Sequence, residues 1–380
     1  MSVDSVVKPK LLTLCGYRIL PATDGGKKGI YLFEKYLAAH FELIMIATKD
    51  NSPDEALTFT LKKMLGKNSL RYVNPILLFQ LYRIIKTEKI NYFLIEHCYF
   101  GWVGVLLKWI AGVKLIVHHH NIEATRFKSL NKWWWRILWQ YEKIVSKQAD
   151  ENFYKTNEDK LFAIAAFGLN PIHTMTVPFG TPISSSPTLE QKNECTSTIS
   201  TMHGIAPDTL LFMFAASYNY PPNLQALKII LEEINPILCN LQKQYKIIIC
   251  GGGLPKEMLN LYEYQSKHVI YAGFVDDIDV YFKGCHIFLN PVLEGGGIKT
   301  KLVEALACGQ SAVSSKIGAM GVTIDLSAPK LVIAMQDDAA AYLHAINELL
   351  PSISAPTRDV FFEYFSWKQI AKKVYTKIMN

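Results

Sequence analysis

Short apolar runs alternate with amphipathic helical patterns along the first half of the chain. The apolar runs predict strands, and the segments between them carry apolar residues at helical spacing. The predicted strands cover residues 10–14, 42–48, 91–97, 114–120 and 151–156, and the predicted helices cover 29–40, 74–89, 99–112 and 133–148. Strands and helices that alternate in this way form a parallel sheet covered by helices on both faces.

The alternation stops at residues 180–201, which are rich in Ser, Thr and Pro, and we interpret 181–206 as a linker. It then resumes, with predicted strands at 209–217, 245–253, 269–275, 285–291, 310–315 and 330–335, and predicted helices at 221–238, 300–308 and 361–378. The pattern therefore predicts an α/β protein with two Rossmann-like, doubly wound domains, at 1–180 and 207–360, that face each other across a cleft. The last segment, 361–380, is expected to be a helix that packs back toward the N-terminal domain.

Composition narrows the class of protein. The chain has 380 residues, half of them hydrophobic, which suits two globular domains. Its net charge of +7 suits phosphorylated ligands or an anionic membrane, but the lysines and arginines are too dispersed to predict nucleic-acid binding. The seven cysteines form no C-x-x-C pair, so we expect reduced thiols in a cytosolic protein.

The sequence shows neither a secretion signal nor a membrane span. The first apolar run, residues 11–14, is too short for a signal peptide. The longest apolar region, 103–117, is interrupted by Lys108 and Lys114, whereas a membrane span needs about 20 apolar residues. We expect a cytoplasmic location, with peripheral binding to the inner face of the membrane as a candidate addition.

The stretch Glu294–Ser315, EGGGIKTKLVEALACGQSAVSS, places three glycines and two lysines between a predicted strand and a predicted helix. Glycines let the backbone approach a ligand closely, and a helix N-terminus attracts phosphate through its N–H groups and its dipole. Lys299 and Lys301 add positive charge, and Glu304 lies one turn into the helix, where it could accept hydrogen bonds from a ribose. A glycine turn with solvated lysines remains the alternative interpretation.

Residues 290–322, NPVLEGGGIKTKLVEALACGQSAVSSKIGAMGV, resemble the nucleotide-sugar motif of the retaining glycosyltransferases of family 4, which have the GT-B fold. The resemblance is greatest to the subgroup with a triple glycine. Other segments are similar to this family in the same order along nearly the whole chain: DGGKKGIYLFEKYLAAH, HHHNIEATRF, YEKIVSKQADENFYKTNED, ASYNYPPNLQAL, YAGFVDDIDVYFKGCHIFLNP and FSWKQIAKKVY.

The resemblance implies roles for particular residues. Glu304 would hold the donor ribose, Lys301 would contact phosphate, and His120 would lie beside the donor sugar; these are the candidate catalytic residues. The other implied donor-binding residues are Gly25, Gly26, Phe274, Val275, Glu294, Gly295, Gly296, Gly297, Ile298, Lys299 and Thr300. The family's first motif glutamate is replaced here by Gly296, and Glu294 is the candidate substitute.

The resemblance also implies a mechanism. The enzyme would transfer a sugar from a nucleoside-diphosphate donor to a glycan, a lipid-linked or a small-molecule acceptor, with retention of anomeric configuration. Helix N-termini and lysines would stabilise the leaving phosphate, so no metal or other cofactor is expected. Asp277 and Asp279 form a D-x-D sequence, which we interpret as a helix start rather than a metal site. A GT-B epimerase and a catalytically silent sugar-nucleotide-binding protein remain alternatives.

Three further segments carry candidate chemistry. In the triplet at 118–120 only His118 and His120 share a face of a strand, and no Cys or Glu at metal spacing is near them in the sequence, so we predict no metal there.

Glu96 and His97 end another strand and are candidates for the acceptor side or for local capping. Residues 128–148 mix tryptophans with basic residues, which suits an anionic membrane surface or a helix that packs on the core.

Overall fold

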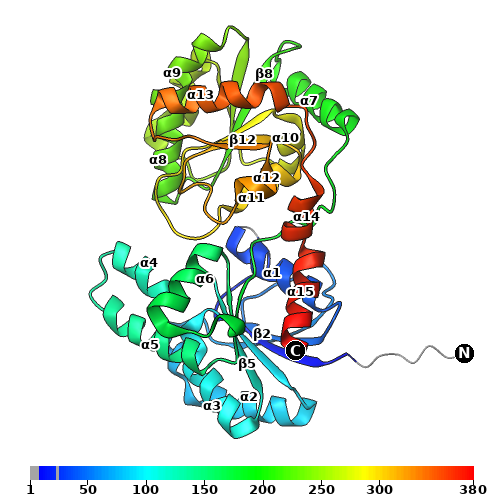
Figure 1. Cartoon of the computed structure of the whole chain (residues 1–380), viewed down its shortest axis with the longest axis vertical. Coiled ribbons are helices and arrows are strands. Elements are labelled where there is room, and N and C mark those ends of the chain that lie inside the picture. The colour runs from blue at the N-terminus through cyan, green and yellow to red at the C-terminus, as the bar shows by residue number, and fades with distance from the viewer. Residues whose placement is uncertain (1–7, 23–24) are drawn as a thin grey trace, which may run out of the picture. The chain divides into compact units, whose positions relative to one another are not determined.

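The computed structural model describes residues 8–22 and 25–380, which fall into two compact units. The first unit is Met1–Gly180 together with Trp367–Asn380, and the second is Thr181–Ser366. Each unit holds one sheet in which all the strand pairs are parallel (Figure 1). The predicted doubly wound α/β architecture is therefore confirmed for each unit.

In the first unit the strand order is β3-β2-β1-β4-β5-β6-β7. The strands are β1 (Lys10–Leu14), β2 (Glu42–Thr48), β3 (Thr60–Leu65), β4 (Tyr92–Glu96), β5 (Lys114–His119), β6 (Glu151–Tyr154) and β7 (Thr174–Thr176). The α-helices are α1 (Gly25–Leu37), α2 (Pro75–Glu88), α3 (Gly101–Ala111), α4 (Glu123–Ser129), α5 (Trp135–Gln148), α6 (Asn157–Ala163) and α15 (Trp367–Met379).

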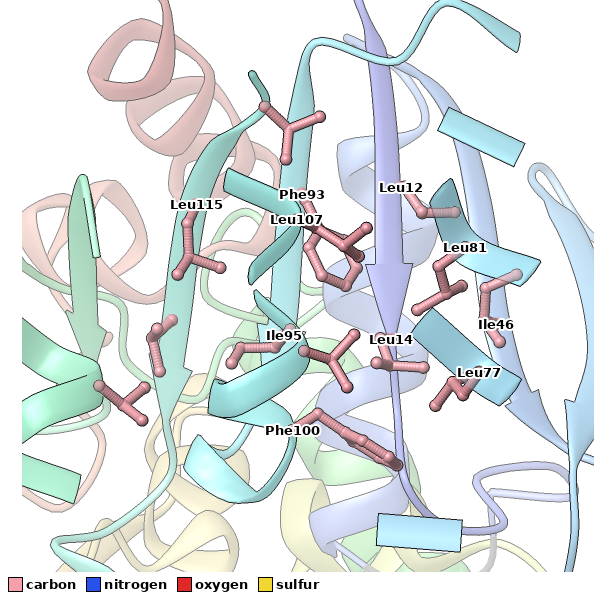
Figure 2. Packing of buried hydrophobic residues seen from close by; sticks show 14 of the residues in the cluster. Leu12, Leu14, Ile46, Leu77, Leu81, Phe93, Ile95, Phe100, Leu107 and Leu115 are labelled. Atoms are coloured by element: carbon pink, nitrogen blue, oxygen red, sulfur yellow. The ribbon is translucent and has the colours of Figure 1, made fainter. Parts of the chain in front are cut away.

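One face of this sheet carries the large hydrophobic cluster drawn in Figure 2. Alternate residues of the central strands point to this face, so Leu12 and Leu14 of β1 meet Phe93 and Ile95 of β4. Helices α2, α3 and α5 cover them with residues such as Leu81. This cluster anchors the strands and leaves their carboxyl ends available for polar groups.

The opposite face of the same sheet is more polar at its carboxyl end. Helices α1 and α15 pack together, and their Phe33 and Trp367 rings lie 6.3 Å apart. The ring of Phe33 also lies 4.7 Å from that of His118 of β5. Two buried acidic side chains, Glu34 of α1 and Glu96 of β4, belong to this layer and are discussed with the site.

In the second unit the strand order is β10-β9-β8-β11-β12-β13. The strands are β8 (Leu210–Ala215), β9 (Tyr245–Cys250), β10 (Val269–Gly273), β11 (Ile287–Asn290), β12 (Ser311–Ser314) and β13 (Leu331–Ile333). The α-helices are α7 (Leu189–His203), α8 (Pro221–Ile229), α9 (Asn235–Leu238), α10 (Ile278–Gly284), α11 (Thr300–Ala307), α12 (Ile324–Ser327), α13 (Ala339–Leu349) and α14 (Asp359–Phe365).

The structure differs from the sequence-based expectation at two boundaries. The expected linker, 181–206, belongs to the second unit and contains α7, whose start is fixed by a capping box between Thr188 and Gln191. The expected continuous helix at 361–378 is broken at Ser366, which has extended backbone angles, and the chain passes from the second unit to the first there. None of the helices in the described part of the chain is long and apolar enough to cross a membrane.

Candidate functional site

The strand orders locate two edges where ligands are expected. In doubly wound sheets, ligands bind at the carboxyl ends of the strands on either side of the point where the strand order reverses. That point lies between β1 and β4 in the first unit and between β8 and β11 in the second. Tyr17 and His97 follow β1 and β4, and the glycine turn Gly295–Gly297 follows β11. The predicted phosphate-binding turn therefore occupies the expected place in its own sheet.

Lys299 holds the glycine turn from within. Its ammonium nitrogen lies 2.8, 3.4 and 3.2 Å from the carbonyl oxygens of Gly295, Gly296 and Gly297. In a trans peptide the N–H points opposite to the C=O, so the N–H groups of Gly296, Gly297 and Ile298 point away from this ammonium. These N–H groups therefore lie on the side of the backbone opposite Lys299, where each can donate to a ligand.

Helix α11 begins directly after this turn. Its first residue is Thr300, with Lys299 as the N-cap residue in an extended conformation. The first N–H groups of any α-helix have no acceptor within the helix, and the helix dipole is positive at that end. The turn and the helix start thus form one candidate phosphate-binding segment, 295–301, that does not depend on an exposed side-chain charge.

Glycine is required in this turn by backbone conformation. Gly295 has φ of 91° and Gly297 has φ of 72°, in the left-handed region that other residues adopt only with strain. A Gly297→Ala change should cost about 1–2 kcal/mol of local backbone energy and weaken nucleotide binding about tenfold.

The matched control for this change is Gly204→Ala, because Gly204 has φ of 61° at the end of α7 and an added Cβ there meets no atom within 4 Å. Isothermal titration with nucleoside diphosphates should show full affinity for the Gly204 variant. Equal affinity for both variants would mean that the turn does not contact the nucleotide.

Lys301 lies in the first turn of α11, and Glu304 follows three residues later on the same helix. The Lys301 ammonium is 2.9 Å from a carboxylate oxygen of Glu304, and it lies over the ring of Phe282 at 5.5 Å from the centroid. Glu304 is buried, with 8% of its surface exposed, whereas the Lys301 side chain keeps 36% exposure. The lysine is placed to share its charge between Glu304 and an anion, and the glutamate is held in one orientation.

The remaining predicted donor-binding residues of the second unit lie at two places, one after β10 and one beside the glycine turn after β11. Phe274 and Val275 follow β10, at the sheet edge, and 81% of the Phe274 side chain is exposed. Strand β10 is three strands from β11, which is about 14 Å at ordinary strand spacing. Only an extended ligand such as a nucleotide can reach both places. Glu294, the candidate substitute for the family's first glutamate, is exposed beside the turn.

The first unit contains the other predicted residues, Gly25, Gly26 and His120. Gly25 and Gly26 form the first turn of α1, which follows the carboxyl end of β1. His120 directly follows β5, and its Nε2 lies 2.5 Å from an oxygen of Glu96. The second oxygen of Glu96 lies 3.1 Å from Nδ1 of His118. One carboxylate thus holds both histidines of the triplet that share a face.

The partnership follows from strand pairing. Glu96 of β4 lies directly opposite His118 of β5 in the register, so both side chains leave the same face of the sheet. His119 lies on the other face, where its Nε2 is 3.1 Å from the Asn152 side chain. The prediction that only His118 and His120 converge is therefore confirmed. The sequence indicated Glu96 only as a candidate for the acceptor side or for capping; its pairing with the two histidines was not predicted, because that proximity depends on which strands are neighbours.

Electrostatics fixes the protonation of this cluster. Burial alone would raise the pKa of Glu96, but His118 and His120 lower it well below its ordinary value. Burial lowers the pKa of His118 to about 4 and that of His120 well below its usual value. At neutral pH the carboxylate is ionised and both imidazoles are neutral. Because a carboxylate only accepts hydrogen bonds, His118 donates from Nδ1 and His120 donates from Nε2.

Lys155, at the end of β6, supplies the compensating charge. Burial lowers its pKa to about 8, while Glu96 acts to raise it. Its ammonium lies over the rings of Phe33 and Trp367, at 5.6 and 5.9 Å from their centroids. Burial and the charge of Glu96 raise the pKa of Glu34 well above its ordinary value, which favours the protonated acid.

The low pKa of His118 predicts a pH dependence of stability. A histidine with a folded-state pKa of about 4 binds no proton between pH 6.5 and 4, whereas the unfolded chain does. The free energy of unfolding of the first unit should therefore fall by up to about 3 kcal/mol as pH is lowered through this range.

All seven tryptophans belong to the first unit, so tryptophan fluorescence during urea unfolding reports on that unit. A His118→Asn variant should lose this part of the pH slope. An identical slope in the variant would show that His118 is not the group that titrates.

The same three side chains form a geometric candidate for a metal site. One ligand atom from each of Glu96, His118 and His120 lies within 4.8 Å of the others. The distances of 3.1 and 2.5 Å from two imidazole nitrogens to two different carboxylate oxygens are those of hydrogen bonds. The hydrogen-bonded arrangement therefore explains the cluster by itself, and Glu96 orients His120 with its Nδ1 lone pair available to a ligand.

A second carboxylate–histidine pair lies beside the first. The ring of His97 stacks on that of His120, with centroids 4.2 Å apart and planes inclined by 18°. Nδ1 of His97 lies 3.2 Å from Glu123, and its Nε2 lies 2.9 Å from the hydroxyl of Tyr17. Strand-end capping, one of the two interpretations of His97, does not account for these side-chain contacts.

The segment 128–148 has two faces. Trp134 and Trp139 pack against the core of the first unit, while 82% of the Trp133 side chain is exposed. Ile137 and Ile144 are also largely exposed, at 65% and 58%. The tryptophans of this segment therefore do not all face the core. The exposed apolar residues alternate with exposed cations, among them Lys128, Lys132, Arg136 and Lys147.

Comparison with known proteins gives two family matches. Residues 23–184 match the model described as Glycosyltransferase Family 4. Residues 209–352 match the model described as Glycosyl transferases group 1. A curated relative, an uncharacterized 44.6 kDa protein in the cps region of Klebsiella pneumoniae, is 28% identical over 177 residues. That alignment covers 44% of this chain and 45% of the relative, so the chain matches less than half the relative's length.

Solved structures share the fold over nearly the whole chain. HepE from Anabaena, in complex with UDP, aligns with a TM-score of 0.73 and 15% identity, covering 97% of this chain and 99% of its own. A sucrose-phosphate synthase from Thermosynechococcus elongatus aligns with a TM-score of 0.71, 15% identity and the same coverage. WaaG, a glycosyltransferase involved in lipopolysaccharide biosynthesis, aligns with a TM-score of 0.65 and 10% identity, covering 97% of this chain and 100% of its own. Each half of the chain therefore matches a glycosyltransferase family model, and the whole chain has the fold of the GT-B glycosyltransferases.

Proposed function

We propose that this protein is a glycosyltransferase that uses a nucleoside-diphosphate sugar, retains the anomeric configuration and needs no metal ion. The observation that carries the proposal is the segment 295–301, in which Lys299 binds three carbonyl oxygens of the turn and the N–H groups of the same peptides face away from it beside the start of α11. Such a segment recognises a diphosphate through fixed dipoles, and those dipoles act most strongly when charge develops on the leaving phosphate. Addition of EDTA should therefore leave sugar transfer unchanged.

In the proposed reaction, the acceptor oxygen bonds to the anomeric carbon on the face from which the phosphate departs. The bond between that carbon and the phosphate oxygen breaks, and the acceptor proton passes to the departing phosphate. Lys301 and the N–H groups of the glycine turn would stabilise the negative charge, and Glu304 would hold the ribose. His120, oriented by Glu96, would accept a hydrogen bond from a hydroxyl of the donor sugar.

The acceptor class is proposed to be a growing or lipid-linked glycan of a polysaccharide pathway. Support comes from the relative in a cps region and from the structural neighbour WaaG, which is involved in lipopolysaccharide biosynthesis. The first experiment is a thermal-shift screen with UDP, GDP and ADP and with their sugars. A ligand raises the melting temperature only if the folded state binds it. The absence of any shift at millimolar nucleotide would contradict the proposal.

Two alternative functions predict different outcomes when the protein is incubated with the nucleotide sugar that it binds. A silent binding protein is favoured by one observation, the exposed Gly296 at the place of the family's first glutamate. It would bind the donor without releasing nucleoside diphosphate. An epimerase would convert the donor without any acceptor. Transfer of the sugar to an added glycan, followed by mass spectrometry, distinguishes the transferase from both.

We also propose that the exposed face of 128–148 binds anionic membranes. Its exposed apolar and basic side chains fit an interface between headgroups and acyl chains. Replacement of Trp133 and Ile137 by Ser should reduce pelleting with phosphatidylglycerol vesicles about tenfold. The control is Ile172→Ser, since Ile172 is 72% exposed in the same unit but outside this segment. Equal pelleting of both variants would contradict membrane binding by this segment.

A further inference from the structure

The side chain of Tyr17 is held by a chain of hydrogen bonds that begins at a buried carboxylate. Glu123 is buried at the start of α4, and burial, which acts to raise its pKa, is outweighed by His97, Tyr99 and Arg126, which lower it to about 2. The carboxylate is therefore ionised and can only accept hydrogen bonds. It accepts from Nδ1–H of His97 at 3.2 Å and from the hydroxyl of Tyr99 at 2.7 Å.

The chain of contacts continues from His97 to Tyr17. Nδ1 of His97 faces Glu123, and its Nε2 lies 2.9 Å from the Tyr17 hydroxyl, within hydrogen-bond distance. Burial raises the pKa of Tyr17 well above its ordinary value, so the hydroxyl keeps its proton. A protonated phenol can exchange a hydrogen bond with the hydroxyl of a ligand.

Position and strain both indicate a functional site here. Tyr17 follows β1 and His97 follows β4, and these strands flank the reversal point of the first sheet. The backbone of His97 has φ of 65° and ψ of 162°, a region that is essentially limited to glycine. The ring contacts to Tyr17, Glu123 and His120 hold the residue in that conformation. A histidine is thus kept where glycine would fold with less strain.

The position of Glu123 is itself fixed by a second buried acid. The backbone N–H groups of Glu123 and Ala124 each donate to a carboxylate oxygen of Glu142 at 3.0 Å, so Glu142 of α5 caps the start of α4. The Arg126 guanidinium lies 3.0 Å from the second oxygen of Glu123. The whole chain of groups from Glu142 to Tyr17 is therefore pre-organised in the described structure.

We infer that Tyr17, oriented by His97 and Glu123, binds the acceptor hydroxyl of the sugar transfer. The inference rests on the proposed function and adds to it the residues of the acceptor side. It also specifies the ligand chemistry: the protonated hydroxyl of Tyr17 exchanges a hydrogen bond with an alcohol of the acceptor. Tyr17 contacts the acceptor, and His97 and Glu123 are positioning residues.

The test compares variants with the donor found in the nucleotide screen and with octyl β-glucoside as the probe acceptor. Tyr17→Phe removes the hydroxyl and should lower transfer at least tenfold, through a higher KM for the glucoside, while donor affinity stays within twofold of wild type. The matched control is Tyr375→Phe on α15 in the same unit, which should transfer at the wild-type rate. Unchanged transfer by Tyr17→Phe would overturn the inference.

A second variant distinguishes a positioning role of His97 from a role in folding. His97→Gly removes the ring but suits the backbone conformation, and it should lower transfer at least tenfold. Added imidazole can occupy the space between Tyr17 and Glu123, so it should restore a measurable part of the lost rate. A rate that imidazole leaves unchanged, in a variant that still binds the donor, would contradict the positioning role of His97.

If the wild-type protein transfers no sugar from any donor, the proposed function fails, and the site is then judged by binding. Saturation-transfer NMR with octyl β-glucoside should show contacts for the wild type and the Tyr375 variant and weaker contacts for Tyr17→Phe. Equal contacts in all three proteins, or none in the wild type, would overturn the acceptor site as well.

Discussion

A Glu304→Ala variant should lose about 100-fold in affinity for nucleoside diphosphates. The proposed contact is a pair of hydrogen bonds from ribose hydroxyls to an ionised carboxylate, and bonds to charged groups contribute about 1.5–3 kcal/mol each. The carboxylate is buried on α11 and already oriented by Lys301 at 2.9 Å, so little entropy is lost on binding. Removal of Glu304 also frees the Lys301 ammonium, which recovers part of the loss by turning toward the phosphate.

The measurement is isothermal titration with the nucleotide found in the screen. Glu348→Ala is the matched control, because Glu348 is an exposed glutamate on α13 in the same unit. The Glu348→Ala variant should bind the nucleotide as tightly as the wild type does. The nucleotide affinity of a Glu304→Gln variant should lie between those of Glu304→Ala and the wild type, since the uncharged amide oxygen still accepts one hydrogen bond. Wild-type affinity in Glu304→Ala would remove the ribose assignment.

A His120→Ala variant should lose about 100-fold in the rate of sugar transfer, with little change in nucleotide affinity. Loss of a single pre-organised hydrogen bond to a reacting substrate costs about 100-fold or more in turnover. His120 presents its Nδ1 lone pair because Nε2–H is engaged by Glu96 at 2.5 Å. The effect should appear in kcat, since the proposed contact involves the sugar and not the nucleotide.

Glu96→Gln tests how His120 is held. Its amide can donate to Nε2, which would move the imidazole proton to Nδ1 and remove the lone pair offered to the sugar. We expect a loss of transfer close to that of His120→Ala, and a changed His120 tautomer in NMR spectra of histidine-labelled protein. The control is His173→Ala, since the His173 side chain is 54% exposed and pairs with Glu151 instead. An unchanged tautomer in Glu96→Gln would contradict the orienting role of Glu96.

Most of the fold could be predicted from the sequence because its signals are local. Strands such as 10–14 and 42–48 were predicted at the bounds that the structure shows, since fully buried parallel strands are continuous apolar runs. Strand β3 was missed because it lies at the sheet edge and carries Lys62 and Lys63, which suit an edge. Helix α7 was missed because its Ser- and Thr-rich sequence has little amphipathic pattern, although the capping box at 188–191 was a usable signal.

The sequence alone determined the candidate phosphate segment of this protein. A strand, three glycines and a helix start are contiguous, so their proximity needs no tertiary information. The role of Lys299 was not determined in this way: the sequence suggested a charge for the phosphate, and the structure shows an ammonium bound to three carbonyl oxygens of the turn. That assignment depends on backbone angles at Gly295 and Gly297, which residue types permit but do not specify.

Only the tertiary structure decided which side chains meet in the first unit. Glu96 reaches His118 and His120 because β4 and β5 are neighbours in register, and Tyr17 reaches His97 across 80 residues because β1 lies beside β4. Strand order is set by the packing of the whole sheet and its helices, and not by any one segment. The sequence therefore fixes where each chemical group lies along a strand, whereas the sheet decides its partner, its protonation state and the ligand that it can accept.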